Sequence, residues 1–161
     1  RALTDERWVM GRGRVVAHGP FEEALGQRAV LELSDRLAVS NVLCVQEIQA
    51  TSDGVEGRVG DQRVVLPSDP PGSALQTGQA WIQVRPSDLI LAREDVGPTS
   101  ARNIFRGTVL EVLEAPGGCV VRLDLGAAVL SASVTRSAVQ ELRLENGTRL
   151  RILVKTTALR W

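Results

Sequence analysis

Apolar and polar residues alternate with a period of two along most of this chain from about residue 40 onward. The alternating segments are short, and glycine, proline, asparagine and aspartate separate them, which is typical of strands joined by tight turns. The pattern predicts strands over 41–49, 55–59, 62–66, 80–84, 89–91, 108–113, 119–125, 129–134 and 149–154. A short helix is predicted over 137–142, where Ser137 and Gln140 have the spacing of a capping box. The chain is therefore predicted to be mainly β.

Two segments of the chain repeat one another. Leu75–Gly78 precedes the strand that ends at Arg85, and Leu144–Gly147 precedes the strand that ends at Lys155. In both copies a leucine and a turn glycine lead into an alternating strand that finishes with a cation, so one small β module is built twice. About five short strands with one helix before the last long strand describe a small, partly open barrel of the oligonucleotide- and oligosaccharide-binding (OB) type. Two tandem OB-like five-stranded barrels with short helices are predicted.

The first 38 residues have a different pattern of predicted elements from the rest. A strand pair is predicted over 8–10 and 14–17, on either side of the turn Gly11-Arg12-Gly13, and a helix is predicted to start at Pro20. This stretch forms a small α/β tail that is too short to build a core alone. The polar, breaker-rich segment 94–98 marks a junction between the two modules. The predicted divisions are residues 1–38, 39–95 and 96–161.

Composition excludes several classes of function. Nineteen Lys and Arg balance nineteen Asp and Glu, and only 3% of residues are aromatic. Proteins that bind single-stranded nucleic acid combine basic grooves with stacking aromatic side chains, so no nucleic acid is expected as a ligand. No apolar run approaches the roughly 20 residues of a membrane-spanning helix, so no direct insertion into a membrane is expected.

The residues needed for catalysis or metal binding are scarce. His18 is the only histidine, and no phosphate-binding loop of the Walker A form is present. No catalytic residue is expected, and this fragment is not expected to be an enzyme or to hold a cofactor of its own. Cys44 and Cys119 lie far apart without neighbouring ligands, so no metal site is expected, and both are interpreted as small core residues.

Three groups of residues favour the binding of a small anion. The first contains Ser100, Arg102 and Asn103; the second contains Thr135 and Ser137 at the start of the predicted helix; the third contains Lys155 and Thr156. Hydroxyl, amide and cationic donors of this kind select a small dianion through hydrogen bonds without a broad basic surface. Each group also has a structural explanation: a capped turn, ordinary helix capping, and a solvated lysine at a strand end.

The sequence of these groups resembles a known family. The parts that carry the resemblance are 99–103, Gly107–Val109, Val134–Thr135, 142–147 and Ile152–Lys155, and together they are similar to the molybdate-binding Mop domain of the Mop/TOBE type over residues 98–161. Upstream, Gly13–Pro20 resembles the end of the nucleotide-binding domain of ABC-transporter ATPases, and Val84–Leu89 resembles an accessory-domain motif of importer subunits. In this order the segments are similar to the C-terminal portion of the ATP-binding subunit of a molybdate importer.

The resemblance implies a regulatory role. It implies a cytoplasmic protein, peripheral at the inner face of the cell membrane, that forms a homodimer through this region and contacts a membrane permease through a missing ATPase domain, where ATP and Mg²⁺ bind. Molybdate or tungstate bound between two copies would inhibit transport. The pattern places Ser100 and Arg102 on one side of that site, with Thr135, Lys155 and Thr156 contributed by the neighbouring chain.

Other functions stay open at this point. Storage-type members often carry a second hydroxyl three residues after the threonine, whereas this chain has Ala138 there and Ser137 one position earlier. A dimerisation module of an importer ATPase that binds no anion is therefore an alternative. A molybdate storage protein of the molbindin type and an importer of sulfate, polyamine or sugar are further alternatives.

Overall fold

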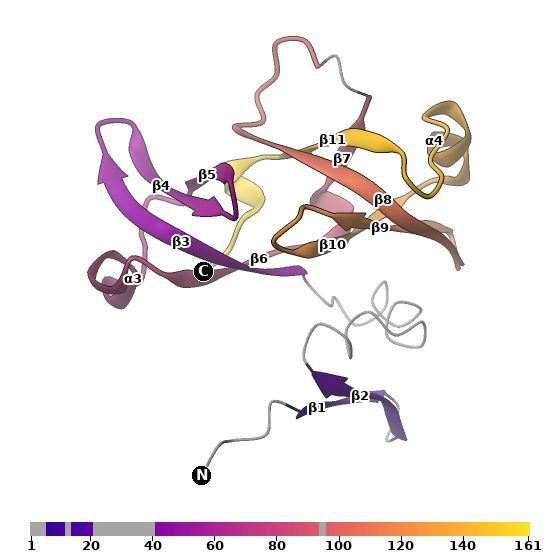
Figure 1. Ribbon diagram of the computed structural model, residues 1–161, viewed down its shortest axis with the longest axis horizontal. Coiled ribbons are helices and arrows are strands. Elements are labelled where there is room, and N and C mark those ends of the chain that lie inside the picture. Colours follow the sequence, from indigo (N-terminus) through magenta and orange to yellow (C-terminus); the bar gives the residue numbers. More distant parts are fainter. Residues whose placement is uncertain (1–5, 12–13, 21–40, 94–95) are drawn as a thin grey trace. The chain divides into compact units, whose positions relative to one another are not determined.

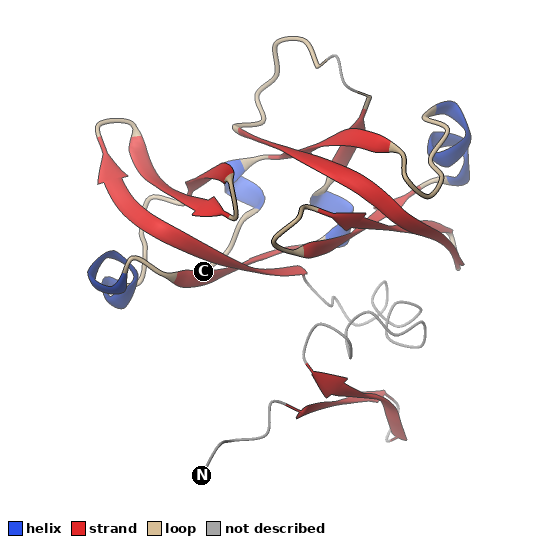
Figure 2. Ribbon diagram, viewed as in Figure 1, coloured by secondary structure: helices blue, strands red, loops and turns tan. Residues whose placement is uncertain are grey.

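The computed structural model describes residues 6–11, 14–20, 41–93 and 96–161. The chain divides into two compact units, residues 1–39 and 40–161. In the first unit, β1 (Glu6–Gly11) and β2 (Arg14–Pro20) form an antiparallel hairpin (Figure 2), which confirms the predicted strand pair. The Trp8 and His18 rings face each other across this hairpin, with their centroids 5.2 Å apart. The helix was predicted to start at Pro20, but Pro20 is the last residue of β2. The remainder of the predicted helix lies outside the described residues.

The second unit contains the same series of elements twice (Figure 1), which confirms the repeat. The first series is β3 (Asn41–Thr51), β4 (Gly54–Val59), β5 (Gln62–Leu66), α3 (Gly72–Thr77), β6 (Ala80–Val84), the 3-10 helix η1 (Pro86–Asp88) and β7 (Ile90–Ala92). The second is β8 (Asn103–Ala115), β9 (Gly118–Asp124), β10 (Val129–Val134), α4 (Arg136–Glu141), β11 (Arg149–Val154) and the 3-10 helix η2 (Thr156–Ala158). The fold is mainly β, with two OB-like barrels.

Helix α3 and the beginning of β8 were not predicted. No helix was predicted in the segment before the turn glycine, but six residues form α3, which ends at Gly78 in the left-handed region at φ 68°. The corresponding Gly147 after α4 has φ 84°, so both turn glycines supply a conformation that other residues rarely adopt. Strand β8 begins at Asn103, five residues before the predicted start. The sequence had predicted an anion-binding group or a capped turn at residues 99–103, without a strand that begins at Asn103.

Each half of the second unit completes the sheet of the other half. The five-stranded sheet has the order β10-β9-β8-β11-β7, so a strand of the first half pairs with the last strand of the second. The other sheet has the order β5-β4-β3-β6, and there Gln83 of β6 pairs with Arg160 through two backbone hydrogen bonds of 2.7 and 2.9 Å. The C-terminal segment of each half thus pairs with the other half. The predicted boundary between the two subdomains, at residues 95 and 96, stays a proposal.

Two buried asparagines fix this exchange. Asn103, at the start of β8, accepts a hydrogen bond from Val65 N (2.7 Å) and donates to Val65 O (3.1 Å), so its amide binds both backbone groups of a residue in β5. Asn41, at the start of β3, does the same with Ser131 in β10, with distances of 2.7 and 3.0 Å. A side-chain amide in this position replaces a strand neighbour, because it offers one donor and one acceptor. Each half therefore stabilises the third strand of the other.

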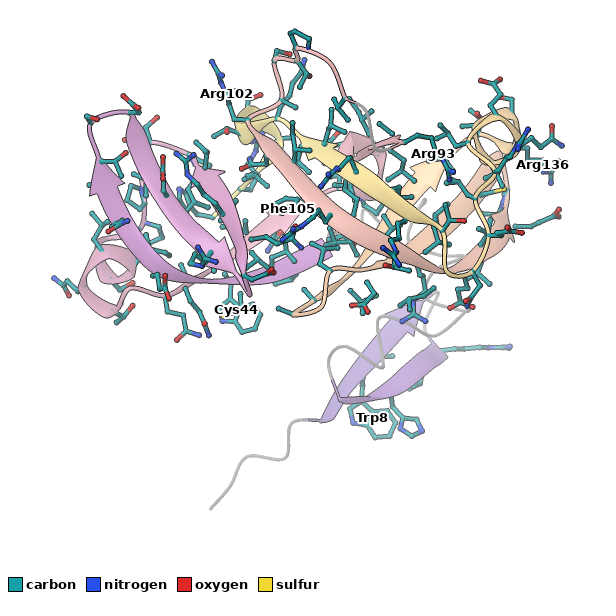
Figure 3. All side chains as sticks on the ribbon, turned by 45° about the horizontal axis from the view of Figure 1, so that its top comes forward. Trp8, Cys44, Arg93, Arg102, Phe105 and Arg136 are labelled. Atoms are coloured by element: carbon teal, nitrogen blue, oxygen red, sulfur yellow. The ribbon has the colours of Figure 1, made fainter. Side chains whose placement is uncertain are left out.

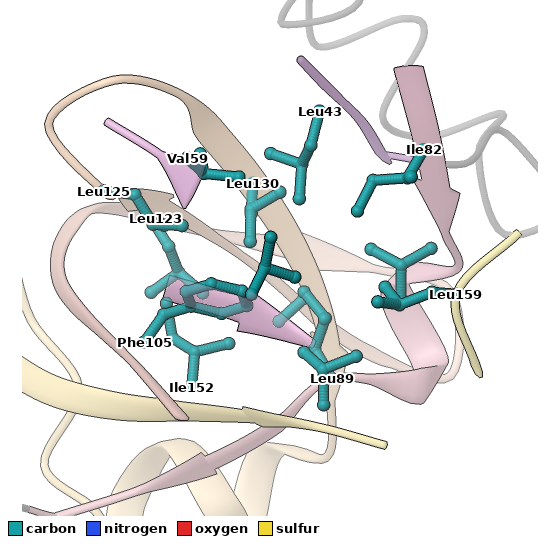
Figure 4. Packing of buried hydrophobic residues seen from close by; sticks show 14 of the residues in the cluster. Leu43, Val59, Ile82, Leu89, Phe105, Leu123, Leu125, Leu130, Ile152 and Leu159 are labelled. Carbon is teal, nitrogen blue, oxygen red and sulfur yellow. The ribbon is translucent and has the colours of Figure 1, made fainter. Parts of the chain in front are cut away.

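A single hydrophobic cluster extends through both barrels (Figure 4). Phe105 and Ile152 pair across β8 and β11, and Leu43 and Ile82 pair across β3 and β6, with all four side chains almost fully buried. Leu89 packs in this cluster from the first half and Leu159 from the second, and Figure 4 shows Leu159 beside Ile82. Burial of a large apolar side chain contributes about 1.5–3 kcal/mol, so the exchange adds to the stability of both barrels.

Two smaller predictions need correction. The N-cap of α4 is Thr135, whose hydroxyl accepts from Ala138 N at 3.1 Å, and not Ser137. The chain leaves β10 in an extended conformation at Thr135, so the first free N–H groups of the helix point back to that residue. Cys119 is buried, as expected of a core residue, but Cys44 is only half-buried and accepts a hydrogen bond from Gln79 Nε2 at 2.9 Å.

No helix in the described part of the chain is long and apolar enough to span a bilayer.

A cross-strand ion pair makes the stability of this fold depend on pH. Glu56 of β4 lies opposite Val65 and accepts a hydrogen bond from Arg63 Nε at 2.6 Å. This hydrogen bond, opposed by partial desolvation and helped by the charge of Arg63, holds the pKa of Glu56 below its ordinary value of 4.5. A lowered folded-state pKa contributes stability that is present above pH 4.5 and is lost as the pH falls further, through the folded-state pKa.

We therefore expect Glu56→Gln to weaken the acid dependence of the unfolding midpoint below pH 4.5. Thermal unfolding followed by circular dichroism at a series of pH values measures this. Glu141→Gln is the control, because Glu141 is exposed and has no ion pair among the described residues. Identical acid dependence in Glu56→Gln and the unmodified chain would contradict the assignment.

Candidate oxyanion site

One group of the predicted site residues lies where β8 begins and β11 ends. Asn103 pairs with Val154 in the register of these strands. Arg102 directly precedes Asn103, and Lys155 directly follows Val154, so both cations lie next to the paired ends of β8 and β11. Both side chains are exposed. The strand ends therefore carry a guanidinium and an ammonium group at the same edge of the sheet.

Thr156 belongs to the same group. Its hydroxyl donates to Val65 O at 3.3 Å, and Asn103 Nδ2 donates to the same carbonyl at 3.1 Å. Asn103 is only 1% exposed, and both polar atoms of its amide are engaged with Val65. Direct contact between Asn103 and an anion stays a prediction, and the geometry favours a positioning role for it. Val65 is the residue that sequence reasoning missed, because only its backbone takes part.

Ser100 lies in the turn that leads into this group. Ala101 N donates to Thr99 Oγ1 at 3.2 Å, a local hydroxyl-capped turn, and Ala101 is buried. Thr99 therefore provides the capped turn that is the structural explanation for this segment. Ser100 and Arg102 flank the buried Ala101 and are both exposed. The turn directs their side chains away from the core, where an anion has access to them.

The helix residues form a separate group. Thr135 Oγ1 accepts from Ala138 N and lies 3.0 Å from Ser137 Oγ, so the two hydroxyls share a hydrogen bond at the start of α4. Both residues are exposed. The neighbouring Arg136 Nη2 lies 3.6 Å from Glu114 Oε2, which places the start of α4 at the far end of β8. One of the helix N–H groups is thus already used by the N-cap.

The two groups are far apart in one chain. Asn103 is the first residue of β8 and Glu114 is the last but one, and an extended strand rises about 3.3 Å per residue, so they lie up to about 35 Å apart. Figure 3 shows Arg102 and Arg136 well separated on the molecule. Within one chain, Lys155 and Thr156 lie at the same strand ends as Arg102, whereas Thr135 lies at the far end of β8. A single small anion cannot contact all of these residues within one chain.

The electrostatics of the first group favour an anion. Within residues 41–93 and 96–161, neither Arg102 nor Lys155 has an ion pair, whereas Arg136 is compensated by Glu114. Charge-assisted hydrogen bonds from such cations to an oxyanion are shorter and stronger than those between neutral groups. The described residues contain no cluster of three His, Cys, Asp or Glu side chains. The exposed cations of this group are therefore able to donate charge-assisted hydrogen bonds to an anion.

Comparison with known proteins agrees with this chemistry. Residues 99–160 match the TOBE domain family. The chain is 31% identical over 159 residues to the molybdate/tungstate import ATP-binding protein WtpC of Pyrococcus horikoshii, and 30% identical over 167 residues to the molybdenum import ATP-binding protein ModC of Methylococcus capsulatus. These matches cover 98% of this chain and 42% and 44% of the relatives, so the chain spans about two fifths of their length.

A solved structure has the same fold. The cytoplasmic molybdate-binding protein ModG, in a form with molybdate bound, superposes with a TM-score of 0.64, covering 74% of this chain and 93% of its own. Its sequence identity to this chain is 24%, so this likeness concerns the fold. The family match begins at Thr99 and ends at Arg160, which includes all seven candidate residues. Residues 99–160 thus match the TOBE domain family, and the whole chain is similar to the C-terminal part of molybdate and tungstate import ATP-binding proteins.

Proposed function

We propose that this chain is the C-terminal regulatory part of a molybdate or tungstate importer's ATP-binding subunit, and that it binds the oxyanion between two copies to inhibit transport. The observation that carries the proposal is the pair of uncompensated cations, Arg102 and Lys155, beside the hydroxyl of Thr156 at the ends of β8 and β11. Guanidinium and ammonium groups bind a tetrahedral dianion through charge-assisted hydrogen bonds.

The separation of the two groups supports a site between subunits. Ser100, Arg102, Lys155 and Thr156 come from one chain, with Asn103 holding the strand that carries them. Thr135 and Ser137 come from the partner chain. A site divided in this way is complete only in the homodimer, so the oxyanion would stabilise one arrangement of the two subunits by mass action.

The same relatives support the wider assignment. ATP and Mg²⁺ would bind to an upstream ATPase domain, which would contact the membrane permease and hold the protein at the cytoplasmic face of the membrane. The proposal assigns no catalytic role to any residue of the regulatory part. Its contribution is a change in the equilibrium between two dimer arrangements, driven by the difference in their affinities for the oxyanion.

Titration calorimetry with molybdate tests the site. Removal of one charge-assisted hydrogen bond costs about 1.5–3 kcal/mol, so Arg102→Gln and Lys155→Gln are each expected to weaken binding about 10- to 150-fold. Arg85→Gln is the matched control, because Arg85 ends β6 as Lys155 ends β11 and is equally exposed. Sulfate is the size control. Unchanged affinity in both site variants would refute the assignment.

One observation favours a module that dimerises without an anion. Ile104 and Ile90 lie on either side of Leu153 across β8, β11 and β7, and they are 42% and 54% exposed. Such an apolar row on a sheet face is suited to contact with another protein surface. Light scattering during the same titration distinguishes the two functions: a dimer that gives no heat with molybdate supports the dimerisation module.

A further inference from the structure

A second polar site lies between the two barrels, away from the candidate oxyanion site. The turn between β4 and β5 contacts the turn between β9 and β10 so closely that a Cβ at Gly60 would lie 2.6 Å from Ala127 Cβ. Beside this contact, the outer face of β8 and β11 forms the floor of a groove with a volume of about 560 Å³. Its polar lining includes Asp61, Gln62, Arg106, Thr108, Arg149 and Arg151, and we name it the arginine groove.

The groove floor is a regular block of four side chains. Arg106 is opposite Arg151 and Thr108 is opposite Arg149 in the antiparallel register of β8 and β11. Opposite residues are about 5 Å apart and alternate residues along a strand about 7 Å apart, so three guanidinium groups and one hydroxyl share a small area. Two like charges directly opposite one another destabilise a sheet. An anion between them would remove that cost.

Carboxylates in the groove compensate only part of this charge. Arg106 Nη2 lies 3.1 Å from Asp61 Oδ2, and both side chains are exposed. Asp124 Oδ1 accepts a hydrogen bond from Gly126 N at 2.7 Å. Neither the Arg149 side chain nor the Arg151 side chain has an ion pair or hydrogen bond to any residue that the structure describes. The groove therefore keeps an excess of positive charge in a chain whose net charge is zero.

The backbone around these arginines is held in place by an amide. Gln62 Oε1 accepts from Arg106 N at 2.6 Å, and Gln62 Nε2 donates to Arg106 O at 3.0 Å and to Leu125 O at 3.2 Å. One side chain from the first barrel thus fixes a strand and a turn of the second. The guanidinium groups project from backbone that is already positioned, which lowers the entropy cost of binding a ligand.

The internal repeat shows that the fold does not require these cations. Asn103–Val154 and Asn41–Val84 are equivalent pairs, and three positions further along each strand the second barrel has Arg106 opposite Arg151. At the same place the first barrel has Cys44 opposite Trp81. Since the same backbone accepts a thiol and an indole there, the fold does not require arginine at positions 106 and 151.

We propose that the arginine groove binds a diphosphate group, as free pyrophosphate or within an ester. Guanidinium groups form bidentate hydrogen bonds with phosphoryl oxygens, and three of them spread over about 5 by 7 Å can hold two phosphoryl groups at once. The volume exceeds what one tetrahedral oxyanion fills. The residues that line the groove include no aromatic side chain on which a base could stack, so the diphosphate itself supplies the binding energy.

Titration calorimetry of the purified chain with inorganic pyrophosphate tests this proposal. Arg149→Gln and Arg151→Gln are each expected to weaken binding at least about tenfold. Arg85→Gln, which removes an exposed arginine outside the groove, is expected to leave it unchanged. A nucleoside diphosphate is the second arm: equal affinity supports recognition of the diphosphate alone, and tighter binding supports an esterified ligand.

A competition separates this site from the proposed oxyanion site. Saturating molybdate is expected to leave pyrophosphate affinity unchanged, and Arg102→Gln is expected to alter only molybdate binding. The proposal is overturned if pyrophosphate gives no binding, if the Arg149 and Arg151 variants bind it normally, or if molybdate displaces it. Circular dichroism of each variant checks that these exposed substitutions leave the fold intact, so that a loss of binding reports on the groove.

Discussion

Residues 40–95, produced without residues 96–161, are expected to show no cooperative unfolding transition. Strand β7 has β11 as its neighbour in the sheet, and Arg160 completes the pairing of β6. Leu89 and Leu91 are 4% and 9% exposed in the joined structure. Exposure of buried leucines costs about 1.5–3 kcal/mol each, and domains of this size are stable by only about 5–15 kcal/mol. The isolated half would lose a large part of its stability.

Thermal denaturation followed by circular dichroism compares residues 40–161, each half alone, and an equimolar mixture of the halves. The mixture is expected to regain a cooperative transition, because the exchanged strands pair again. The control is the intact unit cleaved at a protease site inserted at Gly97, within the exposed segment that joins the halves. A cooperative transition in residues 40–95 alone, near the midpoint of the intact unit, would show that the exchange adds little.

Asn103→Ala is expected to destabilise the protein by about 2–4 kcal/mol. The substitution removes two hydrogen bonds and leaves the N–H of Val65 without a partner, whereas the Val65 C=O keeps the Thr156 hydroxyl. An unsatisfied buried group costs about 1–3 kcal/mol, and a lost hydrogen bond about 0.5–1.5 kcal/mol. Asn41→Ala is expected to have a similar effect, because Asn41 binds Ser131 in the same way. Among the described residues, Asn41 and Asn103 are the polar residues that are buried.

Urea denaturation measures these differences in free energy of unfolding. Asn146→Ala is the matched control: Asn146 also donates to a backbone oxygen, that of Leu110, but it is exposed, so water replaces the lost partner. Its expected cost is about 0.5–1.5 kcal/mol. A loss of less than about 1 kcal/mol in both Asn103→Ala and Asn41→Ala would contradict the role assigned to the amides.

The sequence predicted local structure well where periodicity is strong. The strands from β3 to β11 were found because alternate residues face a core, and the turn glycines were found because Gly78 and Gly147 need a positive φ. Helix α3 was missed because its six residues carry only one buried side chain, Ala74, and so have little helical periodicity. The N-cap of α4 was predicted to be Ser137 instead of Thr135, because both are good capping residues. The extended backbone at Thr135, which follows β10, decides between the two.

The candidate site was predictable as a set of residue types but not as an arrangement. The donors Ser100, Arg102, Lys155 and Thr156 are visible in the sequence. That Asn103 is buried, and that Thr135 lies at the opposite end of β8, depends on strand register. The arginine groove was not predicted, because Arg106, Arg149 and Arg151 lie in two strands that are more than 40 residues apart in sequence and look like ordinary solvent-facing positions.

The sequence by itself determined the mainly β fold, the repeat of one module and the donors available to an anion, since these follow from periodicity, turn residues and composition. The tertiary structure alone decided that β7 joins the sheet of the second module and Arg160 bridges to the first, that Asn41 and Asn103 join each half to the other, and that the two groups of donors are separated. The physical reason is that these features rest on backbone pairing between distant segments. Hydrogen bonds to backbone groups such as those of Val65 and Ser131 leave no pattern in side-chain identity.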